Sequence, residues 1–138
     1  MRYPYHLDAF LRDLAKKSPS AVVLTDFESR SLHAGDESGL EPVVPGAVVQ
    51  VRNAQEAAGV LQAASMHGVS VTPRGGGSGK AGGAIPDENG IVLTLKCEGV
   101  GIDIDPINRL AIVDAGVILA SLAEAASSFG LRYGPDPA

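Results

Sequence analysis

Several common classes of protein need residues that this sequence has little of. A single cysteine, Cys97, excludes an internal disulfide framework and a cysteine-based metal cluster. The formal charge is −5 and no run of Lys or Arg offers a face for phosphates, so we expect no nucleic-acid binding. No apolar run approaches the roughly 20 residues that a membrane span needs, and the N-terminus lacks the pattern of a secretory signal. We therefore expect a cytoplasmic protein without a membrane span.

Aromatic residues are also scarce, with three Phe, three Tyr and no Trp. Because hydrophobic residues still make up 45% of the chain, the core should be aliphatic and rich in alanine. Glycine is abundant instead: there are 17, well above the average usage of about 7%, and eight lie between Gly68 and Gly90. Such clustering indicates a stretch where the backbone, rather than the side chains, makes the contacts.

Hydrophobic spacing along the 138 residues predicts one α/β domain. Asn53 and Glu56 can cap the start of a central helix and Gly68 can end it, so this helix joins two strands as a parallel crossover. Residues 25–46 show no sustained period and are predicted to be a long loop. The remaining expected elements are a helix at 7–14, strands at 47–51, 69–72, 91–95, 101–104 and 110–114, a turn at 105–108, a helix from 119 to Gly130, and an extended end at 133–138.

The segment from Pro73 to Gly83 contains six glycines in the nine positions from 75 to 83. It is not a Walker loop, because Ala81 rather than Ser or Thr follows Lys80 and Arg74 stands where the first glycine belongs. Gly77, Gly79 and Gly82 match the dinucleotide fingerprint GxGxxG, but no long helix can start after them, so we treat the match as accidental. A turn without a ligand would gain nothing from so many glycines. We predict a loop of main-chain N–H groups that binds an anion, with Ser78, Arg74 and Lys80 as further donors, and a diphosphate as its natural guest.

The loop Pro73–Gly79 with Gly82 and Gly83 resembles the pyrophosphate loop of FAD-linked oxidases of the vanillyl-alcohol oxidase and p-cresol methylhydroxylase superfamily. Within it, the sequence is most similar to the branch of glycolate oxidase and D-lactate dehydrogenase. The likeness extends from Asp36 onward: it includes the element Asp36-Glu37-Ser38-Gly39, the strand-helix-strand unit 45–73, the strand 108–116 and the segment 133–137. Lys80 and Ala81 depart from the Leu and Ser that are usual in this branch.

The resemblance implies a fold and a set of cofactor-binding residues. The chain would be a small parallel βαβ lobe plus additional strands and a helix, the first part of a PCMH-type FAD-binding domain that spans residues 46–138 after an N-terminal helix and linker at 1–45. The implied FAD-binding residues are Arg74, Gly75, Gly76, Gly77, Ser78, Gly79, Gly82, Pro135 and Asp136. Because Ser78 stands where some relatives attach flavin through a His, the FAD should be non-covalent.

The resemblance also implies a role in an FAD-dependent oxidase or dehydrogenase of 2-hydroxy acids such as glycolate or D-lactate. Relatives continue into a second part of the FAD domain and a substrate domain, so we expect this chain to be a truncated piece that is inactive alone. Expected partners are those remaining parts, an electron-transfer subunit and, through an exposed sheet edge, a second copy. The alternatives are a nucleotide- or phosphate-binding module without redox chemistry, and an interaction fragment that completes a larger oxidase.

No catalytic or metal-binding residues are expected within the chain. The three histidines are far apart in sequence, and Ser78 has no His and Asp partners for nucleophilic catalysis. Asp103 and Asp105 alternate onto one face of a strand beside a turn, which favours solvated acids over a metal site. Cys97 has no basic neighbour except Lys96, so we interpret it as a buried or unreactive thiol.

Overall fold

The computed structural model describes residues 5–96 and 101–135. The chain divides into two compact units, residues 1–96 and 97–138. Two residues singled out from the sequence, Cys97 and Asp136, lie outside the described residues.

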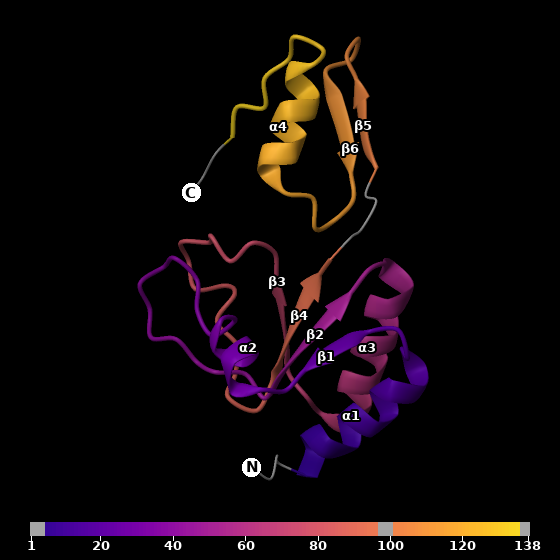
Figure 1. The fold of residues 1–138 in the computed structure, drawn as a ribbon, viewed down its shortest axis with the longest axis vertical. Helices are drawn as coiled ribbons and strands as arrows, with labels where there is room; N and C mark the ends of the chain where they lie inside the picture. Colours follow the sequence, from indigo (N-terminus) through magenta and orange to yellow (C-terminus); the bar gives the residue numbers. More distant parts are fainter. Residues whose placement is uncertain (1–4, 97–100, 136–138) are drawn as a thin grey trace. The chain divides into compact units, whose positions relative to one another are not determined.

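The first unit contains helix α1 (Tyr5–Lys17), strand β1 (Val22–Leu24), helix α2 (Phe27–Ser31), strand β2 (Ala47–Val51), helix α3 (Ala54–His67), strand β3 (Val71–Arg74) and strand β4 (Ile91–Leu95) (Figure 1). The predicted caps of the central helix are confirmed. The Asn53 side chain accepts a hydrogen bond from Glu56 N–H at 2.9 Å, and Gly68 ends the helix in the left-handed region at φ 62°.

The strands form one sheet in the order β1-β2-β4-β3. Strands β2 and β3 are both parallel to β4, which lies between them, and β1 adds antiparallel to the free edge of β2. The parallel crossover was therefore predicted correctly, but the sequence did not show that β4 would separate its two strands. Strand β3 begins two residues later than predicted, because the N–H of Val69 still bonds the Ala64 carbonyl at the end of α3.

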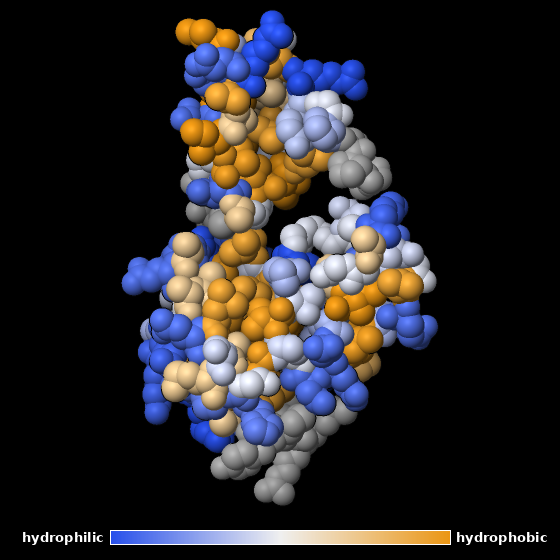
Figure 2. Space-filling model, turned by 180° about the vertical axis from the view of Figure 1, so that it is seen from behind, coloured by the Kyte–Doolittle hydropathy of each residue, from blue (hydrophilic) through white to orange (hydrophobic). Residues whose placement is uncertain are grey.

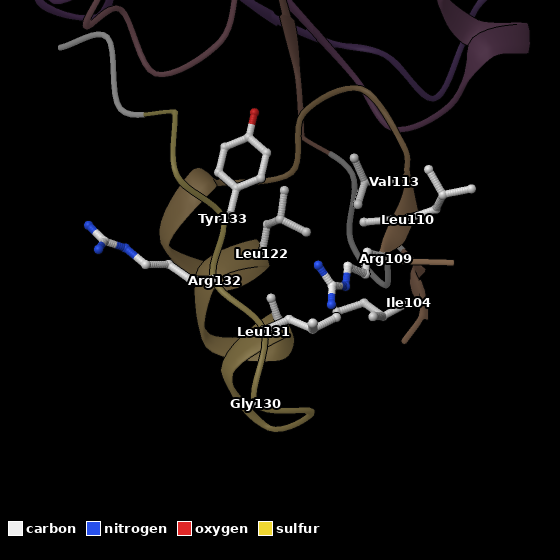
Figure 3. A pocket seen from close by; sticks show the side chains of 11 residues that line it. Ile104, Arg109, Leu110, Val113, Leu122, Gly130, Leu131, Arg132 and Tyr133 are labelled. Atoms are coloured by element: carbon white, nitrogen blue, oxygen red, sulfur yellow. The ribbon is translucent and has the colours of Figure 1, made fainter. Parts of the chain in front are cut away.

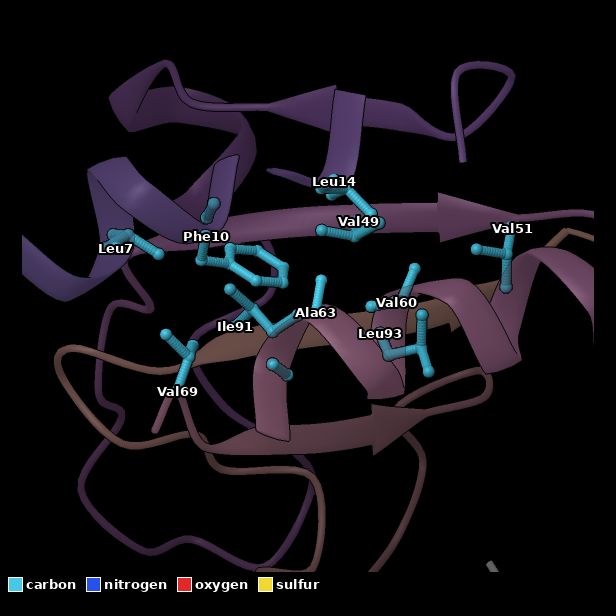
Figure 4. Packing of buried hydrophobic residues seen from close by; sticks show 12 residues of the cluster. Leu7, Phe10, Leu14, Val49, Val51, Val60, Ala63, Val69, Ile91 and Leu93 are labelled. Carbon is cyan, nitrogen blue, oxygen red and sulfur yellow. The ribbon is translucent and has the colours of Figure 1, made fainter. Parts of the chain in front are cut away.

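One face of this sheet carries the hydrophobic core. Alternate residues of β2 and β4, among them Val49, Val51 and Ile91, pack against α1 and α3 and are fully buried (Figure 4). Helix α1 contributes the face that its spacing predicted, with Phe10 fully buried at its centre. This layer of helices fixes the sheet, and so fixes the edge at which the parallel strands end.

The opposite face of the sheet is covered by the segment that the sequence analysis predicted to be loop alone. Helix α2 lies within it, capped by Asp26, whose carboxylate accepts a hydrogen bond from Ser29 N–H at 2.8 Å. Arg30 from this helix is buried and donates to the Pro45 carbonyl at 3.0 Å. The prediction of a plain loop at 25–46 was wrong for this helix, which is only five residues long and too short for a periodic pattern.

The second unit is a hairpin with one helix. Strands β5 (Ile102–Asp105) and β6 (Leu110–Val113) pair antiparallel, and helix α4 (Leu119–Ser127) follows. The predicted turn is confirmed, since the Asp105 carboxylate accepts hydrogen bonds from the N–H groups of Ile107 and Asn108, both at 3.0 Å. Together the two units give a mixed α/β fold built on a parallel-strand sheet, as the sequence predicted.

Candidate functional site

The glycine-rich loop, residues 75–84, begins where strand β3 ends. The parallel strands β2, β3 and β4 all point the same way, so this loop leaves the sheet at the edge formed by their carboxyl ends. Open α/β sheets generally hold ligands outside the carboxyl ends of their strands. In Figure 1 the loop runs beside the segment that leads from α2 to β2.

Four consecutive N–H groups of this loop are available for a ligand. Among the described residues, the N–H groups of Gly75, Gly76, Gly77 and Ser78 donate no hydrogen bond. A Cβ added at Gly75 or Gly76 would meet nothing within 4 Å, so the backbone there can be approached closely. Unpaired N–H groups in a row, without side chains in the way, form a surface that suits an anion with several oxygens.

Two glycines of the loop are required by its conformation. Gly77 and Gly82 both have φ of 77°, a region that other residues adopt only with strain. A Cβ at Gly77 would overlap the Arg74 guanidinium, and one at Gly82 would lie 2.6 Å from Cδ1 of Leu40. The loop therefore turns sharply at both points against neighbouring side chains.

The Arg74 guanidinium, which the sequence suggested as a cationic partner of the anion, is held by the protein itself. Its Nη1 donates a hydrogen bond to the Gly35 carbonyl, and the group lies against Gly77. Lys80, the second cation considered, has its Nζ 2.8 Å from the Glu37 carboxylate, with both side chains more than half exposed. Any contact of Arg74 with a cofactor stays a prediction.

A second loop, residues 35–40, is bonded to the glycine-rich loop, and the sequence analysis did not foresee this contact. The Asp36 carboxylate accepts a hydrogen bond from Ala84 N–H at 3.4 Å, and Glu37 N–H donates to the Gly79 carbonyl at 3.0 Å. Hydrogen bonds from Ser38, and further ones from the Ala84 and Gly82 N–H groups, hold the pKa of Asp36 below its usual value. The element at 36–39 was noted as a family resemblance, but nothing in its residues pointed to this contact.

The last two predicted site residues are Pro135 and Asp136. Pro135 is exposed on the segment that follows α4 in the second unit, and Asp136 lies outside the described residues. The proximity of these two residues to the glycine-rich loop stays a prediction.

A pocket of about 670 Å³ lies within the second unit, between the hairpin and α4 (Figure 3). Its lining is largely aliphatic, with Arg109, Arg132 and Tyr133 as the polar side chains. Every residue of β6 is exposed, including Ile112 at 74%, and hydrophobic residues gather on the visible face of this unit in Figure 2. This pocket is an apolar space between a small hairpin and its helix, and its lining holds no set of groups suited to acid–base or nucleophilic chemistry.

Histidines and possible metal ligands outside the glycine-rich loop have structural roles or do not come together. His33 Nδ1 lies 2.7 Å from the Ser29 carbonyl, and His67 Nε2 lies 3.4 Å from the Asp13 carboxylate, so both rings are held within the fold. In the part of the chain that the structure describes, no three His, Cys, Asp or Glu side chains come together as a metal site. None of the helices in residues 5–96 and 101–135 has the length and hydropathy to span a membrane.

Residues 45–138 match the family described as "FAD binding domain". The chain is 37% identical over 108 residues to glycolate oxidase subunit GlcD of Bacillus subtilis, covering 78% of this chain and 23% of that protein. It is 41% identical over 90 residues to a D-lactate dehydrogenase of Archaeoglobus fulgidus, covering 65% of this chain and 20% of that protein. The chain thus spans less than a quarter of the length of these curated relatives.

Solved structures show the same fold. The structure of p-cresol methylhydroxylase with substrate bound superposes with a TM-score of 0.68 at 20% identity, covering 91% of this chain and 24% of that one. The predicted resemblance to FAD-linked oxidoreductases, and among them to glycolate oxidase and D-lactate dehydrogenase, is confirmed.

Proposed function

This chain belongs to the FAD binding domain family, and from that premise we propose that it binds the diphosphate of FAD through the main chain of residues 75–79. The proposal depends mainly on one observation, the four consecutive N–H groups from Gly75 to Ser78 that have no partner among the described residues. A diphosphate presents oxygens to several of them at once, and charge-assisted hydrogen bonds of this kind are the strong ones.

The geometry of the loop fits this group in a second way. The absence of a Cβ contact at Gly75 and Gly76 lets the phosphate oxygens approach the backbone directly. Ser78 is exposed, and its hydroxyl can add a donor at the end of the row. A serine hydroxyl does not form the bond to flavin that a histidine in this position would form, so we propose that FAD is held without a covalent bond.

We further propose that the protein carrying this chain oxidises a 2-hydroxy acid. Support comes from the relatives named above, since glycolate and D-lactate both bear a hydroxyl group next to a carboxylate. Bound FAD would supply the two-electron acceptor needed to convert such an acid to a 2-oxo acid. The described residues hold the cofactor in this proposal, and the groups that bind the acid and remove its proton belong to other parts of the protein.

The partners predicted from the sequence are proposals as well. The exposed aliphatic residues of β6 and the pocket beside α4 support a role for the second unit as a surface that further polypeptide covers. A two-stranded hairpin is marginally stable at best and gains stability when more strands or helices cover its apolar side. We propose that strands from the remainder of the FAD domain extend this hairpin.

A competition experiment tests the proposed binding. The protein expressed from the complete reading frame that contains these 138 residues would be titrated with FAD, with ADP and with riboflavin, following flavin fluorescence and heat. We expect FAD to bind, ADP to compete with it because ADP carries the same diphosphate, and riboflavin to bind at least about tenfold more weakly because it has no phosphate. Equal affinity for FAD and riboflavin would refute a role for the diphosphate, and no binding of FAD would refute the function.

A further inference from the structure

We propose that Asp36 is a positioning residue of the glycine-rich loop: its carboxylate holds the end of the loop, and this orients the N–H groups of Gly75 to Ser78 before the cofactor binds. The inference rests on the proposed function, because it assigns those N–H groups to the FAD diphosphate. It gives a role to a residue that lies far from the loop in sequence.

The two loops are joined at several points. The Ala84 N–H donates to the Asp36 carboxylate at 3.4 Å, the Gly79 carbonyl accepts from Glu37 N–H at 3.0 Å, and Arg74 reaches back to the Gly35 carbonyl. These contacts lie at the end of the glycine-rich loop, in its middle, and at the residue directly before it. The loop is therefore bonded along its length to one neighbouring segment.

The two ends of the loop differ in what their N–H groups bond. The Ala84 N–H, at the end of the loop, donates to the Asp36 carboxylate, and hydrogen bonding by the Ala84 and Gly82 backbone helps to lower the pKa of Asp36. The N–H groups from Gly75 to Ser78, at the start of the loop, donate no hydrogen bond among the described residues. An internal anion thus binds the end of the loop, and its start is left for an external anion.

Asp36 is itself held in place, which a positioning residue must be. Its second carboxylate oxygen accepts from Ser38 N–H at 3.1 Å, and the neck of its loop is closed by Val43 N–H donating to the Ala34 carbonyl at 2.9 Å. Leu40 from the same loop lies close to Gly82, where an added Cβ would be 2.6 Å from Cδ1 of Leu40. A rigid partner is needed here because a segment with six glycines in nine positions has more conformations to lose on folding than a loop of other residues.

The placement also limits the repulsion between Asp36 and a diphosphate. The Arg74 guanidinium lies between the two loops, bonded to Gly35 and in contact with Gly77. Lys80 and Glu37 form an exposed ion pair at the rim, so their charges offset one another. The carboxylate can therefore act on the loop through its hydrogen bonds without opposing the ligand strongly.

The test compares variants of Asp36 with a matched control in the protein expressed from the complete reading frame. Asp36→Ala removes both carboxylate oxygens, whereas Asp36→Asn keeps one acceptor and loses the other. Asp26→Ala is the control, because Asp26 is also an aspartate that accepts a main-chain N–H, from Ser29, in the same unit, and its pKa is likewise below its usual value. None of the hydrogen bonds described for Asp26 reaches the glycine-rich loop.

Two measurements are made on each protein: FAD affinity by fluorescence titration, and the ¹H–¹⁵N spectrum without FAD. We expect Asp36→Ala to weaken FAD binding about five- to tenfold and Asp36→Asn to weaken it less, since hydrogen bonds to the carboxylate are lost in that order. The amide signals of Gly75 to Ser78 should move toward random-coil positions in Asp36→Ala. Asp26→Ala should lower the melting temperature and leave both readouts unchanged.

The outcomes separate this inference from the proposed function. If the unmodified protein binds no FAD, the proposed function fails. If it binds FAD and the Asp36 variants bind equally well with unchanged Gly75 to Ser78 signals, the positioning role is wrong and the proposed function stands. If Asp26→Ala weakens FAD binding as much as Asp36→Ala does, general loss of stability explains the effect and the inference is overturned.

Discussion

Replacing Gly77 by alanine perturbs the glycine-rich loop at one point and leaves its composition otherwise intact. Gly77 has φ of 77°, and a Cβ there would overlap the Arg74 guanidinium. The substitution therefore has two effects: it places an L-residue in the left-handed region, and it pushes Arg74 from its contact with the Gly35 carbonyl. Both act on the row of N–H groups proposed to bind the diphosphate.

The size of the change in FAD affinity follows from the backbone strain that alanine introduces at this position. An L-residue in the left-handed conformation costs about 1–2 kcal/mol relative to glycine, which corresponds to about a five- to thirtyfold change in an equilibrium constant. In the free protein, an exposed loop can relax and avoid this strain. The cost then appears mainly when the ligand requires the native conformation, so we expect weaker FAD binding with little change in the melting temperature.

The assay is a fluorescence titration with FAD on the alanine variants of Gly77 and Gly83. Gly83 is the matched control, because it lies in the same loop, its φ is not positive, and a Cβ there would meet nothing within 4 Å. We expect Gly77→Ala to bind FAD about five- to thirtyfold more weakly and Gly83→Ala to bind it as the unmodified protein does. Gly77→Asp should abolish binding, since its carboxylate would repel the diphosphate. Equal affinity in Gly77→Ala, or an equal loss in Gly83→Ala, would refute the reasoning.

Three further predictions concern the fold that carries the loop. Phe10→Ala should destabilise the first unit by about 3–5 kcal/mol in a urea titration, because the ring is fully buried in the core; a loss under about 1 kcal/mol would contradict that packing. Gly46→Ala should cost about 1–3 kcal/mol by the same method, since its Cβ would crowd Leu7 and lie 3.1 Å from the Gly90 carbonyl, whereas Gly83→Ala should cost little. A hydrogen bond from the Arg52 N–H is the main cause that holds the pKa of Glu56 below its usual 4.5, and other hydrogen bonds add to it. The ionised Glu56 carboxylate therefore stabilises the fold fully above that pH, and this stabilisation is lost as the pH falls through the lower pKa of the folded state. Glu56→Gln should therefore flatten the fall in the urea midpoint as the pH drops below 4.5, and an unchanged slope would show that this carboxylate is not responsible.

The central part of the fold could be predicted from the sequence because its signals are local. The helix from Ala54 to His67 has a side-chain cap at one end and a left-handed glycine at the other, and the strand before it, Ala47–Val51, is a short and largely apolar run. Such features depend on neighbouring residues only. They also placed the glycine-rich loop at the carboxyl end of a parallel strand, which is where the structure has it.

The parts that were missed depend on contacts between distant segments. Strand β1 has three residues and helix α2 has five, so neither repeats a period often enough to be recognised. Both exist because they pack on the sheet: β1 pairs with the edge of β2, and α2 contacts β2. The position of β4 between β2 and β3 is likewise a property of the assembled sheet, and no local pattern encodes it.

The candidate site likewise has one part that local sequence signals predicted and another that depends on contacts between distant segments. The run of glycines identified the loop, since glycine is the residue type that permits unusual backbone conformations and close approach to the backbone. The sequence could not show that Arg74 bonds the Gly35 carbonyl, that Lys80 pairs with Glu37, or that Asp36 accepts from the loop, because the partners in each pair are 39, 43 and 48 residues apart. The cations thus belong to the link between two loops, a role that only the folded chain reveals.

The most direct test of the account is a ¹H–¹⁵N titration of the protein with FAD, with assigned signals for the glycine-rich loop. If main-chain N–H groups bind the diphosphate, the signals of Gly75, Gly76, Gly77 and Ser78 should shift downfield on addition of FAD and also of ADP. Saturation with FAD that leaves these four signals in place, while others move, would contradict the central claim.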